Sequence, residues 1–453
     1  MEMKKNIDGL ISNRYFESCY AIVLLFTLTQ GPVYRAWYES GKSAALVAFP
    51  PVSLAHYATF LAIQIPALMM LGRRLNMRIL ESRQGAFFIL LLAWMLLSTL
   101  WSVLSRQTLV EAVTFTVTAL CGLYFAASFD SLVRIFITFV AMQLGVVTSL
   151  LAIFRDWSLS VSEEEGYWIG IYLNRNSLAP VAAVGLVAGL FLIFSLARIG
   201  GRGMWTKIAI VACAAFVVVD CWTIWRSQST TSPVAIGVVS AGAIYWCLVR
   251  VVSRSRVDNP FARYSVAAFF VCISVCLGLL FVFQRRFLSM IGESSDFNGR
   301  VAHWKFSWNG VLEHPVLGYG WQAAWRDPNF LRGQGWWTLP NLSRIVDSSG
   351  SESVVVDPSK SWSHSAYFDL LLGGGAVAFA MFLLLIGWAV SVQRGKILYH
   401  KESLFGLSIL LFVLAASSQE SFLTGNHFLW MLLASVLWQS DSVCENQRRL
   451  NST

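Results

Sequence analysis

The stretch QGAFFILLLAWMLLSTLWSVL at residues 84–104 contains no Asp, Glu, Lys or Arg and is long enough to cross a bilayer. A transmembrane helix needs about 20 predominantly apolar residues to span the hydrocarbon core. Similar runs recur along the chain, so the sequence predicts an all-α polytopic membrane protein with about twelve spans. We expect these spans near residues 15–34, 48–71, 84–104, 108–128, 131–153, 176–198, 207–226, 232–252, 263–283, 364–392, 403–419 and 425–439.

The amino-acid composition is that of an integral membrane protein. Of the 453 residues, 56% are hydrophobic and only 13% are charged, whereas a soluble domain carries about 25% charged residues. This balance excludes a water-exposed globule and a disordered chain. Of the eight cysteines, all but Cys444 lie in apolar stretches, which excludes a disulfide framework or a zinc-finger spacing.

The basic residues predict the orientation of the chain. The net charge is +9, and most of the 34 Lys and Arg residues fall in short connections on one side of the predicted spans. Such loops stay in the cytoplasm, so we expect no nucleic-acid partner and place both termini inside. The domains expected are residues 1–283 with nine spans, residues 284–363 as a large periplasmic loop, and residues 364–453 with three spans and a cytoplasmic tail.

The long outer loop is rich in tryptophan and arginine. Tryptophan rings stack on sugars and also settle at membrane interfaces, and guanidinium groups bind phosphate oxygens. Residues 301–312 can form an amphipathic helix on the membrane, with Trp304 and Trp308 one turn apart. The tryptophans expected in this loop are Trp304, Trp308, Trp321, Trp325, Trp336, Trp337 and Trp362.

Three motifs around this loop resemble the O-antigen ligase/polymerase family of bacterial polysaccharide assembly. The first is Asn298-Gly299-Arg300 followed by Trp304, and the second is HPVLGYG at residues 314–320. The third is SHSAYFDLL at residues 363–371, followed by three glycines. Three further segments fit the family: Arg175-Asn176, SQSTT at residues 227–231 with Arg226 before it, and Gln419-Glu420-Ser421.

The resemblance implies a GT-C-like, multi-pass glycosyltransferase in the bacterial inner membrane. Such an enzyme transfers a glycan from a polyprenyl-pyrophosphate carrier to an acceptor hydroxyl at the periplasmic face. The implied partners are the lipid-linked oligosaccharide donor, a glycan or lipid A core acceptor, membrane lipids and other polysaccharide assembly proteins. We expect no cofactor and no metal site, because no Asp-x-Asp motif occurs in a loop.

The candidate catalytic residues are His364 and Arg300. Histidine suits proton removal from a hydroxyl near neutral pH, and arginine can stabilise a departing pyrophosphate. One base without an evident carboxylate nucleophile predicts inversion at the anomeric carbon. Glu420 is an alternative base, and the roles of Asp220 and Asp369 stay open. The candidate substrate-binding residues are Arg226, Arg175, Asn176, Trp304, Tyr319 and Glu420.

Two enzymatic acceptors and one non-enzymatic role remain as alternatives. The serine-rich turn and the Glu420 segment favour an exopolysaccharide or O-antigen polymerase over a ligase that acts on lipid A core. A flippase or transporter of lipid-linked sugars would be expected to carry charged residues through several spans. Glu111, Asp220 and Asp369 are too scattered to favour that role.

Overall fold

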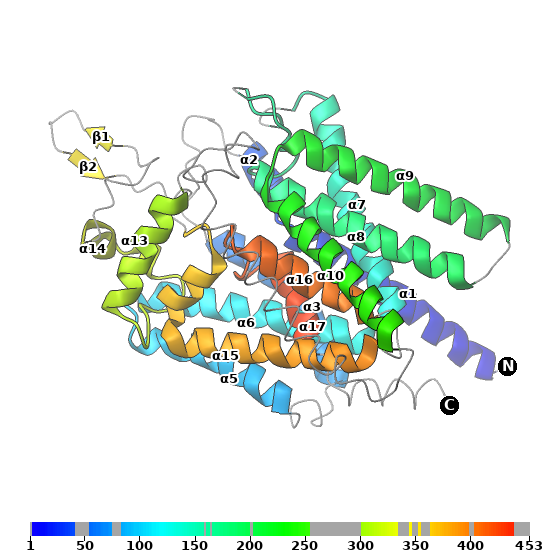
Figure 1. Ribbon diagram of the computed structural model, residues 1–453, viewed down its shortest axis with the longest axis horizontal. Coiled ribbons are helices and arrows are strands. Elements are labelled where there is room, and N and C mark those ends of the chain that lie inside the picture. Colours follow the sequence, from blue (N-terminus) through cyan, green and yellow to red (C-terminus); the bar gives the residue numbers. More distant parts are fainter. Residues whose placement is uncertain are drawn as a thin grey trace.

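A computed structural model of the protein is mainly helical (Figure 1). It describes residues 2–40, 54–74, 83–157, 160–163, 165–199, 203–253, 300–333, 344–346, 352–354, 363–397 and 403–438. The ninth expected span, residues 263–283, lies outside the described residues. The helices of the first half are α1 (Glu2–Leu28), α2 (Gly31–Ser40), α3 (Leu54–Arg74), α5 (Arg83–Leu97), η2 (Ser98–Leu100), α6 (Ser105–Ser128), α7 (Ser131–Phe154), α8 (Arg175–Ile199), α9 (Met204–Ser227) and α10 (Thr231–Ser253).

The second half begins with short elements between residues 300 and 354, which we call the outer segment after the outer loop expected from sequence. Three further apolar helices follow it. The elements of this half are α13 (Arg300–Glu313), η3 (Ala324–Arg326), α14 (Pro328–Gly333), β1 (Arg344–Val346), β2 (Glu352–Val354), α15 (Ala366–Ile397), α16 (Ser403–Ser417) and α17 (Phe428–Leu437). The described residues are helical throughout the apolar part of the chain, as expected for an all-α protein, and the loop adds one short antiparallel pair, β1–β2, beside its short helices. In Figure 1, α13 lies at one end of α15 and α6, with α14 and the strands beyond it.

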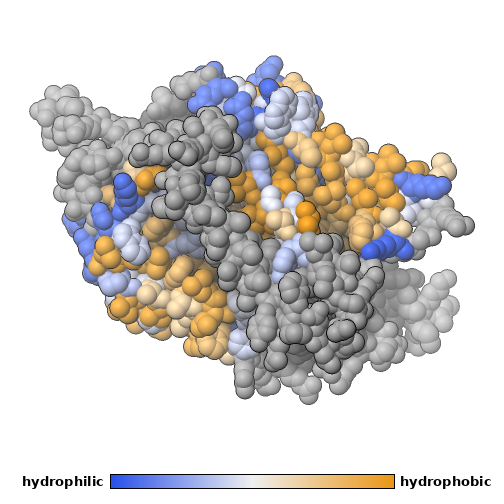
Figure 2. All heavy atoms as spheres, in the orientation of Figure 1, coloured by the Kyte–Doolittle hydropathy of each residue, from blue (hydrophilic) through white to orange (hydrophobic). Residues whose placement is uncertain are grey.

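Several described helices are suited to a membrane. Five of them, α6, α7, α8, α9 and α15, are long and apolar enough to cross one, and shorter apolar helices lie in α3, α5, α10, α16 and α17. Figure 2 shows hydrophobic side chains on the faces of α9 and of α5 and α15. The exposed hydrophobic side chains of these helices include Trp205, Val211 and Trp225 on α9 and Leu384 on α15. The chain is therefore a helical multi-pass membrane protein, while the expected number of twelve spans stays a prediction.

The core is made where apolar helix faces meet. Helix α8 packs between α7 and α9, α6 packs on α3 and α17, and α15 packs on α5. Phe115 of α6 stacks on Trp430 of α17 with ring centroids 4.2 Å apart, and Trp321 of the outer segment adds a ring 4.8 Å from Phe115. Buried aromatic contacts thus attach the outer segment to the helix bundle, so the packing of α6 and α17 determines where this segment lies.

Three of the expected helices are shortened or interrupted, two of them at tertiary contacts and the third at a local cap. The run at 15–34 is broken at Gln30, whose φ of 72° is left-handed and whose side chain donates to the Asn426 carbonyl. The run at 84–104 leaves α-helical geometry after Leu97, because the Ser98 hydroxyl accepts from the backbone N–H of Trp321. The last run begins at Phe428, since His427 caps α17.

Glycines allow the outer segment to dock onto α15. Gly318 has φ of 70° and Gly375 has φ of 66°, and a Cβ at Gly375 would lie within 2.0 Å of the Val316 carbonyl oxygen. The backbone N–H of Tyr319 donates to the Leu372 carbonyl at 2.7 Å, and that of Ala376 donates to Pro315 at 2.8 Å. The second and third motifs therefore form one docking joint, which positions both α13 and the start of α15.

Candidate active site

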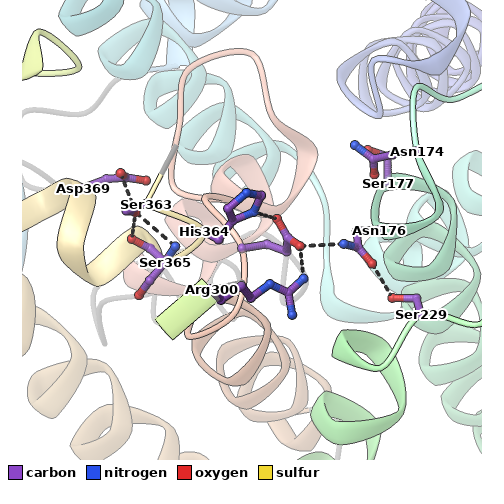
Figure 3. A network of polar contacts seen from close by, with 10 residues as sticks. Asn174, Asn176, Ser177, Ser229, Arg300, Ser363, His364, Ser365 and Asp369 are labelled. Atoms are coloured by element: carbon purple, nitrogen blue, oxygen red, sulfur yellow. Dashed lines mark hydrogen bonds and ion pairs between the residues drawn. The ribbon is translucent and has the colours of Figure 1, made fainter. Parts of the chain in front are cut away.

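A polar network centred on Glu420 joins five parts of the chain. Figure 3 shows Arg300, Asn176, Ser229 and His364 around it. Glu420 lies in the turn after α16, where its carboxylate is only 13% exposed. Its Oε1 atom accepts from Nη2 of Arg300 at 2.5 Å and from Nδ2 of Asn176 at 2.6 Å. Its Oε2 atom lies 3.2 Å from Nδ1 of His364. The Asn176 carbonyl oxygen in turn accepts from the Ser229 hydroxyl at 2.8 Å.

Four helices begin at this network. Arg300 is the first residue of α13, Asn176 is the second of α8, Ser229 stands just before α10 and His364 just before α15. Each helix N-terminus carries unsatisfied N–H groups and a partial positive charge. The site therefore has a positive electrostatic character around its single central carboxylate.

The backbone around His364 is held in an unusual conformation. His364 has φ of 51°, which is left-handed and sparsely populated for a residue other than glycine. On one side, the Ser363 hydroxyl donates to Oδ1 of Asp369 at 2.7 Å and accepts from the backbone N–H of Ser365. On the other, the N–H of Ala366 donates to the Glu420 carbonyl. Asp369 therefore stabilises the turn that contains His364, through its hydrogen bond with Ser363.

The charge state of Glu420 follows from its neighbours. Burial raises the pKa of the Glu420 carboxyl, but the hydrogen bond with His364 and the charge of Arg300 outweigh this effect. The net result is a lowered pKa, so Glu420 is an anion at neutral pH. A carboxylate only accepts hydrogen bonds, so Nδ1 of His364 carries the hydrogen in this contact. In a neutral imidazole with the hydrogen on Nδ1, the lone pair is on Nε2, which can then act as a base.

The remaining sequence candidates lie in other contacts. The Arg175 guanidinium forms an ion pair with Glu165 at 3.7 Å and lies 4.7 Å over the ring of Tyr167. Arg226 lies over the ring of Trp168. The structure thus brings Arg300, His364, Asn176 and Glu420 into one network, whereas Arg175 and Arg226 contact residues of the connection between α7 and α8.

Two candidates of the outer segment are placed nearby. The Tyr319 hydroxyl donates to Oε2 of Glu313 at 2.6 Å, and burial together with this carboxylate raises the Tyr319 pKa. Trp304 is half-buried on α13, one turn from Arg300. Both therefore belong to the segment that carries Arg300, and their roles toward a substrate stay a prediction.

His303 is a further residue of the site that was not predicted from sequence. This buried side chain lies on α13, three residues after Arg300, with its ring centroid 5.2 Å from that of His364 in an edge-to-face arrangement. The signal was the helical spacing, because residues i and i+3 share a helix face and residues 301–312 were expected to be helical. The partner ring at the start of α15 could not be found from local sequence.

Comparison with known protein families supports the motif assignment. Residues 215–345 match the family model described as O-Antigen ligase. This segment of the chain is similar to the O-antigen ligase family, in agreement with the resemblance drawn from the motifs. The matched segment includes Arg226, Arg300 and Tyr319, whereas His364 and Glu420 follow it in the chain. No curated protein matches the sequence.

Proposed function

We propose that this protein transfers a glycan from a polyprenyl-pyrophosphate carrier to an acceptor hydroxyl at the periplasmic face of a bacterial inner membrane. The observation that carries this proposal is the Glu420 carboxylate, which contacts Arg300, Asn176 and His364 together. A base, its orienting carboxylate and a phosphate-binding cation are the groups that this transfer requires. The match of residues 215–345 to the family model described as O-Antigen ligase supports the same reaction class.

His364 acts as the base in this mechanism. Its Nδ1–H donates to Glu420, so Nε2 accepts the proton of the acceptor hydroxyl as the oxygen attacks the anomeric carbon. The new carbon–oxygen bond forms while the bond to the phosphate oxygen breaks, and its electron pair leaves with the polyprenyl pyrophosphate. Glu420 stabilises the imidazolium that forms, as the carboxylate does in hydrolase triads.

Arg300 and the helix N-termini stabilise the leaving group. A guanidinium has five N–H donors, so the contact of Nη2 with Glu420 leaves donors for phosphate oxygens. Before reaction, the negative charge of Glu420 compensates the positive charge of Arg300. Proton transfer to His364 makes the site cationic as negative charge grows on the pyrophosphate. Direct displacement by one acceptor oxygen inverts the anomeric centre.

Polymerisation is the activity that we propose for this site, with another lipid-linked repeat unit as the acceptor. Two polymerase-like segments supply parts of the network, since Ser229 belongs to the serine-rich turn and Glu420 to the segment after α16. The matching family description, O-Antigen ligase, makes transfer to lipid A core the second candidate.

Complementation of a strain that lacks the protein tests the proposal. Wild type, His364→Ala and Arg300→Ala are expressed, and cell-surface glycan is separated on a gel. Lys305→Ala is the matched control, because it removes an exposed cation from the same helix as Arg300. We expect Lys305→Ala to restore polymer and both site variants to fail despite normal membrane levels.

The glycan pattern of the null strain distinguishes the acceptors. Single repeats without long chains indicate a polymerase, and long lipid-linked chains that never reach lipid A core indicate a ligase. Retention of intermediates on the cytoplasmic face would instead support a flippase. Restoration of normal polymer by both site variants would refute the catalytic assignment.

A further inference from the structure

A second buried charge cluster ties the outer segment to the helix bundle. Nη1 of Arg326, in η3, lies 2.9 Å from Oε1 of Glu111 in α6. The Tyr57 hydroxyl of α3 donates to the same oxygen at 2.6 Å. The Arg326 and Glu111 side chains are 19% and 11% exposed. We call Tyr57, Glu111 and Arg326 the Glu111 clamp.

The clamp requires both of its charges. Burial lowers the pKa of the Arg326 guanidinium, but Glu111 and Tyr57 outweigh this and raise it, so the residue stays a cation. Removing one member of a buried ion pair leaves the other charge without compensation, which is strongly unfavourable. The segment that carries Arg326 is therefore held firmly against α3 and α6.

Trp325, the residue before Arg326, packs against α13 and so couples the position of Arg326 to that of this helix. Trp325 is buried and stacks on Phe306 with ring centroids 5.2 Å apart. It also lies 5.9 Å from the ring of His303, which is on the same helix as Phe306. A displacement of Arg326 would therefore move the aromatic surface on which α13 rests.

α13 carries two groups of the candidate active site. His303 presents its ring to His364, and Arg300 donates to Glu420 one turn earlier. The docking joint at Gly318 and Gly375 holds the far end of α13 against α15, whereas the clamp holds the segment beyond that joint against α3 and α6. Two attachments on different helices together define the position of α13.

We propose that Glu111 and Arg326 are positioning residues, which hold α13 so that Arg300 and His303 lie against Glu420 and His364. They act through Trp325 and not by contact with substrate. The effect on glycan transfer rests on the function proposed above, whereas the effect on α13 does not.

A charge exchange tests the proposal. Full-length wild type, Glu111→Arg, Arg326→Glu and the double exchange are purified in lipid nanodiscs. Amide hydrogen exchange is measured in the peptide that covers residues 300–313, and transfer is measured with a polyprenyl-pyrophosphate-linked repeat unit. Lys305→Glu is the control, because it reverses an exposed charge on α13 outside the clamp.

We expect each single reversal to raise exchange in α13 several-fold. Misplacement of a catalytic constellation by about 1 Å costs on the order of 100-fold, so kcat should fall by about that factor while KM changes little. The double exchange restores the ion pair in the opposite sense and should recover both readouts. Arg326→Lys keeps the charge without the guanidinium fork and should fall between wild type and Arg326→Glu.

Wild-type exchange of α13 in both single variants would overturn the proposal, as would a double exchange no better than the singles. A loss equal to that of Lys305→Glu would also overturn it, since any charge change would then suffice. If α13 responds as expected while His364→Ala retains full transfer, the proposed function fails and the positioning role stands.

Discussion

Nη2 of Arg300 lies 2.5 Å from Oε1 of Glu420, although 120 residues separate the two in the chain. The pairing neutralises the charge of Arg300 before a substrate arrives. It also gives Glu420 two roles, because the other carboxylate oxygen orients His364. The network therefore couples the base to the cation expected at the leaving group, and the loss of Glu420 should affect both.

Glu420→Gln removes this charge at nearly constant volume. The amide can still contact Arg300, but it no longer compensates the imidazolium that forms on His364. We expect kcat to fall by about 10⁴-fold, in line with the loss of an orienting carboxylate in hydrolase triads. Steady-state transfer by purified protein checks this, with Glu165→Gln, an exposed carboxylate paired to Arg175, as the control. Full activity of Glu420→Gln would remove Glu420 from the mechanism.

Stability should depend on Glu420 at acid pH. Its folded-state pKa is lowered from the ordinary value of 4.5, so the ionised network stabilises the fold above pH 4.5. This contribution is lost as the pH falls below 4.5 and through the folded-state pKa. We expect the Tm difference between wild type and Glu420→Gln to be constant from pH 5 to 7 and to shrink below about pH 4.5. A constant difference down to pH 3 would contradict this linkage.

Gly375→Ala should break the docking joint. A methyl group there meets the Val316 carbonyl and requires a φ of 66°, so we expect a loss of about 2–4 kcal/mol in stability. Gly387→Ala in the same helix is the matched control, because a Cβ at Gly387 meets no described atom within 4 Å. Thermal unfolding in detergent should show a lower Tm for the first variant alone. Equal Tm values would mean that the joint tolerates displacement.

Asp220→Asn should be tolerated. Asp220 is buried in α9, where Oδ2 accepts from the Gln143 side chain of α7 at 2.8 Å. Within the described part of the chain, the Gln143 amide oxygen has no hydrogen-bond partner, and the side-chain amide introduced by Asp220→Asn could donate to it. Asp220→Leu would leave the Gln143 amide unpaired and should cost about 1–3 kcal/mol.

Unfolding and transfer measurements on both Asp220 variants check this pair of expectations. We expect Asp220→Asn to retain Tm and activity and Asp220→Leu to lose Tm. If Asp220→Asn folds normally but loses transfer, the carboxyl group has a chemical role that packing does not explain.

The apolar helices were largely predictable from sequence. In a bilayer each backbone N–H and C=O must be satisfied within its own segment, so a run such as residues 108–128 forms a helix whatever surrounds it. The expected run and the observed α6, Ser105–Ser128, differ by three residues at one end. The break at Gln30 and the early end of α5 were not predictable, because both depend on partners hundreds of residues away.

The candidate site divides in the same way. The motifs alone pointed to Arg300, His364, Asn176 and Glu420, because each residue type suits a step of glycan transfer. Only the tertiary structure assembled them around one carboxylate and added His303 and Ser229. The physical reason is the sequence separation of the interacting groups. Helix formation depends on hydrogen bonds between residues four apart, whereas a charge network depends on how separate helices pack.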